Sequence, residues 1–311
     1  MAEIVISEFM DEDAVAGLQA DFDVHYDPNL VDAPEDLAGL LADARALVVR
    51  NRTQVRPDLL AAAPRLEVVG RLGVGLDNID VDACRERSVE VRTAGAANAN
   101  AVAEYVMGAA FALVRGALLA SIRVAEGVWP RQEMVGTELA GRRMGLVGLG
   151  GIARLVATKA AALGMDVIAH DPILPADDPA WHLATSVEQG TLLGEADIIS
   201  LHVPLLDSTR HLIGPGAIAA MKPEAIVINT SRGGIVDEDA LLAALRSGRL
   251  GGAALDVFET EPVGPDQHER FAGVPNLILT PHIAGLTEES QRRVGEVTAE
   301  NVRDVLRASE V

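Results

Sequence analysis

Three polar side chains in the last third of the chain could move a proton beside an anion-binding group: Arg232, Glu261 and His282. Imidazole titrates near neutral pH, so His282 can donate or accept a proton. The planar guanidinium of Arg232 matches the two oxygens of a carboxylate. Such a set suits a reaction in which a proton moves at an oxygen close to a bound carboxylate. Taken alone, His282 would more often be an ordinary loop residue, Arg232 could be a surface charge and Glu261 could be a solvated turn residue.

The positions of these residues relative to predicted strands favour the functional interpretation. Each belongs to a polar segment that begins where an apolar run ends. The three segments are Asn229–Gly234, Asp256–Pro262 and Thr280–Gly285. In open α/β sheets, ligands bind beside the carboxyl ends of parallel strands. We therefore expect the three segments to lie at one edge of a sheet.

A second motif predicts a dinucleotide site. Gly148, Gly150 and Ala153 have the spacing G-x-G-x-x-A between a predicted strand and a predicted helix. The first glycine permits a tight turn, the second lets the backbone approach a pyrophosphate, and the small third residue allows close helix–strand packing. Asp171 follows the next strand, where an acid binds ribose hydroxyls. The alternative for Asp171 is an ordinary turn before Pro172.

Short β-branched runs alternate with helical patterns along most of the chain, which is typical of parallel α/β sheets. The predicted strands are Glu3–Ser7, Ala46–Arg50, Val68–Leu72, Met144–Gly148, Asp166–His170, Ile198–Leu201, Ala225–Asn229, Ala253–Asp256 and Leu277–Leu279. The clearest predicted helices are Pro34–Ala44, Ile152–Leu163, Asp237–Ser247 and Glu288–Ala308. One series of strands and helices lies before residue 98 and a second lies after residue 130. Between them is an apolar helical stretch, 98–126, which could be one helix or two because it contains glycines at 108 and 116.

The 311 residues suit two domains. We expect an α/β protein with two doubly wound parallel-sheet domains and a cleft between them. Residues 98–285 would form a Rossmann nucleotide-binding domain. Residues 1–97 and 286–311 would form a flavodoxin-like substrate domain, so that the chain crosses between domains twice.

Composition argues against several classes of partner. The net charge of −20 repels nucleic acid and anionic membranes. No basic start with a long apolar run is present, and no apolar stretch reaches the ~20 residues of a membrane span, so we expect a cytoplasmic protein. The single cysteine, Cys84, excludes an internal disulfide and a thiolate metal site, and we expect no metal. Only two basic residues are lysines, which fits salt adaptation and arginine-favouring codon usage equally.

Further motifs give the chain a family resemblance. They are Gly70–Asp80, Val102–Glu104 and Ser200–Leu205, together with the three polar segments above. In this order and spacing the chain resembles the D-isomer-specific 2-hydroxyacid dehydrogenases, which include 3-phosphoglycerate dehydrogenases. The resemblance covers nearly the whole chain. It implies that Arg232 binds the substrate carboxylate and carbonyl, that Glu261 pairs with His282, and that His282 is the general acid and base.

The resemblance also implies NAD as cofactor, a homodimer built through the nucleotide domain, and further site residues. The expected cofactor-binding residues are Gly148, Gly150, Gly151, Ile152, Asp171, His202, Val203, Pro204, Thr209, Thr230, Ser231, Asp256 and Gly285. Backbone N–H groups around Val74 and Gly75 would hold the substrate carboxylate, and Asn98 matches a family asparagine at the site. Ala153 departs from the commoner glycine, which close packing tolerates.

Two arginines predict that the substrate carries a second anionic group. Arg50 and Arg52 follow a strand, and alternation puts both on one side of an extended chain. In the phosphoglycerate dehydrogenases that the chain resembles, a matching segment lies near the distal phosphate. Substrates of the sulfolactate or 3-phosphoglycerate type would fit, since guanidinium groups bind such anions well. The alternative is two solvated arginines paired with acids such as Asp58.

Two other functions fit the same motifs. One is an NAD(H)-binding module without turnover, because transcriptional corepressors resemble this family. The other is a dehydrogenase of the same fold for a different substrate, such as hydroxypyruvate, glyoxylate, phosphite or formate.

Overall fold

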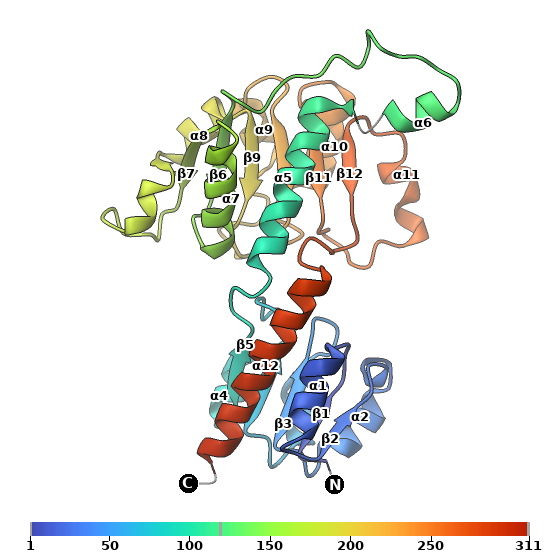
Figure 1. The fold of residues 1–311 in the computed structure, drawn as a ribbon, viewed down its shortest axis with the longest axis vertical. Coiled ribbons are helices and arrows are strands. Elements are labelled where there is room, and N and C mark those ends of the chain that lie inside the picture. The colour runs from blue at the N-terminus through green and yellow to red at the C-terminus, as the bar shows by residue number, and fades with distance from the viewer. Residues whose placement is uncertain (1, 118–119, 310–311) are drawn as a thin grey trace. The chain divides into compact units, whose positions relative to one another are not determined.

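The computed structural model describes residues 2–117 and 120–309. The chain divides into two compact units, shown in Figure 1. Unit 1 contains Met1–Asn98 and Leu286–Val311, and unit 2 contains Ala99–Gly285. Each unit is built around one parallel sheet, as the alternation of strand and helix patterns predicted. Among the described residues, no helix is both long and apolar enough to span a bilayer.

Unit 1 has a five-stranded sheet in the order β2-β1-β3-β4-β5, with all neighbours parallel. This is the flavodoxin-like strand order. The strands are β1 Ile4–Ile6, β2 Val24–Tyr26, β3 Ala46–Val49, β4 Val68–Arg71 and β5 Glu90–Thr93. The helices are α1 Glu12–Gln19, the 3-10 helix η1 Leu30–Asp32, α2 Pro34–Leu40, α3 Pro57–Ala61, α4 Val81–Glu86 and α12 Glu288–Ala308.

The last helix of the chain completes unit 1. α12 packs against α1 and across β4 and β5, so the C-terminal helix covers the same face of the sheet as the N-terminal one (Figure 1). Its apolar stripe, which includes Val294, Val302 and Leu306, is buried in that core. The opposite face packs against α2, α3 and α4. Burial of both faces explains why β1 and β3 are apolar at every position.

Unit 2 has a seven-stranded parallel sheet in the order β12-β11-β10-β9-β6-β7-β8. The strands are β6 Arg143–Val147, β7 Asp166–His170, β8 Thr185–Ser186, β9 Ile198–Leu201, β10 Ile226–Asn229, β11 Gly252–Leu255 and β12 Leu277–Leu279. The helices are α5 Ala99–Arg115, α6 Ala120–Ala125, α7 Gly151–Ala162, η3 Pro179–His182, α8 Gln189–Glu195, α9 Pro215–Ala220, α10 Glu238–Arg246, η4 Pro265–Gln267 and α11 His268–Phe271. The order reverses at β6, as in a Rossmann sheet.

Helices cover both faces of this sheet. α5 and α7 lie together on one face, and α8, α9 and α10 cover the other (Figure 1). In the described part of the helical stretch predicted over 98–126, α5 ends at Arg115, Gly116 adopts a φ of 62°, and α6 begins at Ala120. Positive φ favours glycine and ends a helix.

Candidate active site

His282 and Glu261 form a hydrogen-bonded pair at the carboxyl edge of the unit 2 sheet. Nδ1 of His282 lies 2.8 Å from Oε2 of Glu261, while Oε1 of Glu261 accepts a hydrogen bond of 2.9 Å from the backbone N–H of Phe258. Burial alone would raise the pKa of Glu261, but the hydrogen bonds from His282 and Phe258 and the nearby charges of His282 and Arg232 hold that pKa below its ordinary value. Glu261 therefore stays ionised near neutral pH.

Asp256 anchors the segment that carries His282. Its side chain is only 1% exposed and accepts hydrogen bonds from Thr280 Oγ1 at 2.6 Å and from the backbone N–H groups of Ile283 and Ala284 at 2.8 Å. Its backbone carbonyl accepts the N–H of His282 at 2.9 Å. The tight loop holds His282 at a φ of 56°, a conformation that few side chains adopt. The structure thus gives Asp256 a positioning task, while its expected contact with the cofactor stays a prediction.

Arg232 belongs to a loop braced by Asn229, the last residue of β10. Asn229 is 1% exposed; its Nδ2 donates to the Arg232 carbonyl at 2.9 Å, and its Oδ1 accepts from the N–H and hydroxyl of Ser231. Nη1 of Arg232 donates to the Ser231 carbonyl at 2.6 Å. Gly233 lets the loop approach its neighbour, because a β-carbon there would collide with the Phe258 carbonyl.

Gly148 and Gly150 shape the predicted nucleotide loop between β6 and α7. Gly148 has a φ of 88°, and a β-carbon there would lie 2.6 Å from the His202 carbonyl. A β-carbon at Gly150 would meet no described atom within 4 Å, so the loop is open on that side. Gly151 and Ile152 begin α7, and Ala153 is fully buried against the core. A free helix N-terminus beside a glycine turn suits a pyrophosphate.

Asp171 closes this loop from the next strand. Its Oδ2 accepts the N–H of Leu149 at 2.9 Å, and its Oδ1 accepts the N–H groups of Ile173 and Leu174 at 3.0 and 3.1 Å. Nearby, Arg154 is held by the Leu149 carbonyl at 2.9 Å and by Asp178 at 3.6 Å. The acid at the end of β7 is therefore rigidly placed, and the arginine that could attract a 2′-phosphate is already engaged.

The segment after β9 contains four more of the residues that are expected to contact the cofactor. Nε2 of His202 lies 2.9 Å from the Ser200 hydroxyl, and burial lowers the pKa of His202 to about 4, so its ring is neutral at neutral pH. Val203 and Pro204 follow it in an irregular loop. The Thr209 hydroxyl is bonded within that loop, donating to the Pro204 carbonyl at 2.6 Å and accepting from the N–H of Leu206 at 2.7 Å.

One buried hydroxyl at this edge of the sheet is suited to bond to a ligand. Oγ1 of Thr230 is buried and has no hydrogen-bond partner among the described residues. Such an atom is costly unless something bonds to it. Together with the open backbone at Gly150, it matches a polar cofactor lying along the carboxyl edge of this sheet. Across the described parts of the chain, no group of three or more His, Cys, Asp or Glu side chains could hold a metal ion.

The substrate residues expected in unit 1 lie at the carboxyl ends of β3, β4 and β5. In the loop after β4, Gly73 adopts a φ of 147° and Val74 is 47% exposed, so backbone near Val74 and Gly75 is accessible. Oδ1 of Asn98 is buried without a hydrogen-bond partner in the described structure, a second polar atom suited to a ligand.

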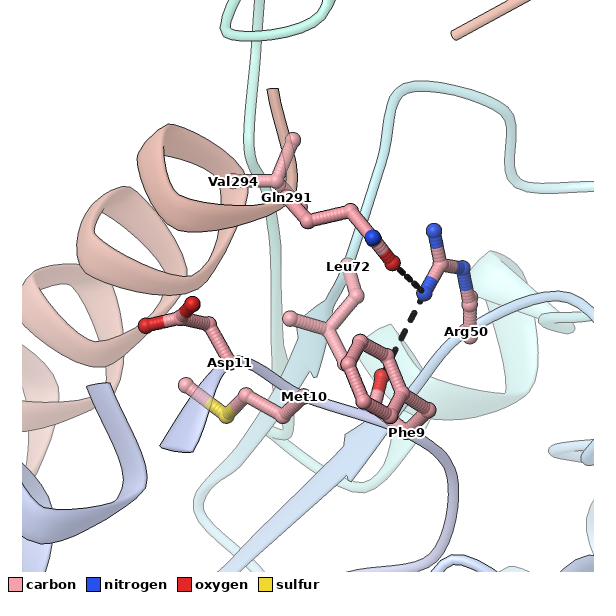
Figure 2. A pocket seen from close by; sticks show the side chains of 7 residues that line it. All are labelled: Phe9, Met10, Asp11, Arg50, Leu72, Gln291 and Val294. Carbon is pink, nitrogen blue, oxygen red and sulfur yellow. Dashed lines mark hydrogen bonds between the residues drawn. The ribbon is translucent and has the colours of Figure 1, made fainter. Parts of the chain in front are cut away.

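The two arginines after β3 have different surroundings. The chain bends over residues 51–53 and does not continue extended, so the alternation assumed for this segment is wrong. Arg52 is exposed and forms a two-pronged ion pair with Asp32, a different acid from the predicted Asp58. Arg50 instead lies against the first residues of α12: its Nη1 is 3.4 Å from the Phe9 carbonyl and 3.4 Å from Oε1 of Gln291 (Figure 2).

Comparison with known proteins agrees with this fold. Residues 107–284, more than half of the chain, match the family model "D-isomer specific 2-hydroxyacid dehydrogenase, NAD binding domain". The chain is 55% identical to a (S)-sulfolactate dehydrogenase of Chromohalobacter salexigens over 98% of its own length and 99% of that protein. It is 40% identical to a D-3-phosphoglycerate dehydrogenase of Methanocaldococcus jannaschii, over 99% of its own length but 58% of that protein.

A solved structure extends the match. The D-lactate dehydrogenase of Aquifex aeolicus, complexed with NAD and lactic acid, aligns with a TM-score of 0.86 and 30% identity over 99% of this chain and 96% of that one. The parallel sheets and the glycine loop define an NAD-dependent oxidoreductase. The chain belongs to the D-isomer specific 2-hydroxyacid dehydrogenase family, whose members interconvert hydroxy acids and oxo acids.

Proposed function

We propose that this enzyme acts on a 2-hydroxy acid with a second strong anion at C3, with sulfolactate as the leading candidate. Arg50 is the observation that carries the proposal. Its guanidinium uses Nη1 for protein contacts, and among the described residues neither Nε nor Nη2 has an acceptor (Figure 2). A half-buried guanidinium with unused donors favours a sulfonate, phosphate or carboxylate. Arg52 would contribute less to binding the second anion, because its guanidinium already forms an ion pair with Asp32.

The names of two relatives support a dianionic substrate. One relative is named a (S)-sulfolactate dehydrogenase and another a D-3-phosphoglycerate dehydrogenase. The (S) label agrees with a D-isomer family, because a sulfomethyl group outranks the carboxylate in the naming rules while the methyl group of D-lactate does not. The same arrangement at C2 is therefore named (R) in lactate and (S) in sulfolactate.

In the chemical step, His282, Glu261 and Arg232 would each have a role. The glycine loop and Asp171 would hold the cofactor, which would accept the C2 hydride as NAD during oxidation and return it as NADH during reduction. Nε2 of His282, the ring nitrogen that does not face Glu261, would take the proton from the C2 hydroxyl during oxidation and return it during reduction. Glu261 would stabilise the imidazolium, and Arg232 would bind the carboxylate and the polarised C2 oxygen.

A substrate panel tests this function. With NADH, the enzyme should reduce 3-sulfopyruvate or 3-phosphohydroxypyruvate with a kcat/KM at least about 10-fold above that for pyruvate or hydroxypyruvate, since one charge-assisted contact is worth roughly 1.5–3 kcal/mol. Arg50→Ala should erase this preference and Arg52→Ala should reduce it less. A preference for pyruvate, or equal losses on both substrate classes in Arg50→Ala, would refute the proposal. No turnover with any 2-oxo acid would instead favour a binding module.

We also propose that the enzyme is a homodimer and works in the cytoplasm. The segment from α6 to residue 136 carries large apolar side chains exposed to solvent, with Ile122 at 71%, Trp129 at 79% and Val135 at 76%. α6 itself has no buried residue. An apolar segment of this kind suits a protein interface, and a second copy of the chain is the partner expected in this family. The single free cysteine fits a reducing compartment.

A further inference from the structure

Glu8 is a buried acid that binds the turn carrying Arg50. It lies two residues beyond β1 and is 4% exposed. Its two carboxylate oxygens accept hydrogen bonds from four consecutive backbone N–H groups, those of residues 50 to 53, at 2.8, 3.3, 3.1 and 3.0 Å. Burial alone would raise the pKa of Glu8, but the N–H groups of Thr53, Arg50 and Arg52 outweigh it and hold the pKa below its ordinary value. Glu8 is therefore an anion at neutral pH.

The same turn is tied to the loop expected to hold the substrate carboxylate. Nδ2 of Asn78, a residue 4% exposed, donates to the Thr53 carbonyl at 2.7 Å and approaches the Arg50 carbonyl at 3.5 Å. The Thr53 hydroxyl lies 3.0 Å from the Ser7 hydroxyl, beside Glu8. The turn is thus fixed on one side by the residues after β1 and on the other by the loop after β4.

Glu8 also acts on the arginine side chain. Burial lowers the pKa of Arg50, and the charge of Glu8 opposes that shift. The Arg50 guanidinium lies 6.0 Å from the centre of the ring of Phe9, the residue that follows Glu8 in the chain. It also contacts Gln291 of α12 (Figure 2). A carboxylate that fixes the backbone and supports the cation would hold Arg50 ready to bind, which lowers the entropic cost of binding.

We propose that Glu8 is the positioning residue for the distal-anion contact of Arg50, and so determines selectivity for dianionic over monoanionic substrates. This inference rests on the proposed function of Arg50. Without the carboxylate, the N–H groups of residues 50 to 53 lose their shared acceptor. The turn of residues 50 to 53, which Asn78 holds beside the carboxylate-binding loop, then relaxes. The guanidinium of Arg50 moves away with it. Substrates without the second anion do not need that contact.

The decisive variant is Glu8→Gln, which keeps the shape of the side chain but replaces one acceptor oxygen with a donor. With NADH, its KM for 3-sulfopyruvate should rise about 10-fold, while kcat and the kcat/KM for pyruvate stay within about 2-fold. Glu67→Gln is the matched control. Glu67 lies just before β4, at the other end of the same sheet, and its carboxylate pairs with Arg45. Its removal should leave the KM for both substrates unchanged.

The combination with Arg50 separates the two proposals. If Arg50→Ala is selective for the dianion and Glu8→Gln is not, or if Glu8→Gln lowers kcat equally for both substrates, the positioning role is wrong while the proposed function stands. If Arg50→Ala shows no selective loss, both are wrong. The double variant should resemble Arg50→Ala alone. Should Glu8→Gln fail to fold, Glu8→Asp keeps the charge one methylene further away; a selective rise in KM for 3-sulfopyruvate supports the role, and an equal loss on both substrates contradicts it.

Discussion

Nδ1 of His282 and Oε2 of Glu261 lie 2.8 Å apart although 21 positions separate them in the chain. Two loops that follow β11 and β12 bring them together, and Asp256 bonds to the backbone of the second loop and to the Thr280 side chain. The pairing fixes the orientation of the imidazole ring. It leaves Nε2 without a partner in the part of the chain that the structure describes, which is the arrangement that a general acid and base requires.

Replacing His282 should abolish most of the catalysis. His282→Ala is expected to lower kcat by about 10²–10⁴-fold, the range for loss of a general acid or base. Because residue 282 has a positive φ, His282→Asn is the better-matched variant, since asparagine tolerates that conformation. Steady-state kinetics with NADH and 3-sulfopyruvate measures the loss, and NADH fluorescence titration checks that cofactor binding is retained. A kcat near the wild-type value would remove His282 from the mechanism.

Glu261→Gln should move the pH profile and not simply lower the rate. The amide keeps one oxygen that can accept from Phe258 or from His282, while its NH2 group can only donate, and the negative charge that stabilises the imidazolium is gone. Reduction needs the protonated ring and oxidation the neutral one, so the pH limbs of both reactions should move to lower pH. Profiles of kcat/KM in each direction measure this. Glu259→Gln is the neighbouring control, and unchanged limbs in Glu261→Gln would make Glu261 merely structural.

Strand positions were predictable where both faces of a strand are buried. Ile198–Leu201, which is buried at every position, was placed with the bounds that the structure has. Leu277–Leu279 was placed as accurately although it is a partly buried edge strand, because three apolar residues in a row lie between polar ones. The edge strands β2, β5 and β8 were missed. β5 has charged, exposed side chains at Glu90 and Arg92, and β8 is only two residues long, so neither carries a hydrophobic signal.

The residues expected to do chemistry at the site were predictable from the sequence, but the residues that hold them in place were not. Strand ends and spacing indicated Arg232 and His282, because ligand sites gather at the carboxyl edge of such sheets. Nothing local marks Glu8, whose four hydrogen-bond donors lie more than 40 positions away. Tyr105 was missed for the same reason: its hydroxyl lies 2.5 Å from that of Thr280, 175 positions further along the chain. Long-range hydrogen bonds of this kind leave no periodic pattern in the sequence.

The enzyme should prefer NAD to NADP. The fixed carboxylate of Asp171 would accept from free ribose hydroxyls and repel a 2′-phosphate, and Arg154 is engaged by Asp178. We expect kcat/KM for NADH to exceed that for NADPH by at least about 10-fold, and Asp171→Asn to narrow the ratio by removing the charge. Asp166→Asn, an exposed acid at the start of the same strand, is the control. Comparable values for both cofactors in the wild type would contradict the role of Asp171.

The exposed apolar segment should be necessary for self-association. Ile122→Glu combined with Trp129→Glu places two charges on the surface proposed to meet a second copy, so the dimer should dissociate. Light scattering after size-exclusion chromatography gives the mass directly. Ile173→Glu is the control, because Ile173 is 86% exposed elsewhere in unit 2. A dimer that persists in the double variant, or a monomeric wild type, would reject this surface as the interface.

His202 should make the enzyme less stable in acid. Its pKa is about 4 in the fold because the ring is buried, against an ordinary value of 6.5. As pH falls below 6.5 the unfolded chain takes up a proton that the folded chain refuses until about pH 4, so unfolding becomes easier across this window. The loss can reach about 3 kcal/mol. In His202→Gln this component disappears, so urea unfolding without cofactor should depend less on pH between 6.5 and 4 than in the wild type. His268→Gln changes an exposed histidine and should follow the wild type. If the free energy of unfolding depends on pH in the same way in His202→Gln and in the wild type, the pKa of His202 is the same in the folded and the unfolded chain, and the prediction is wrong.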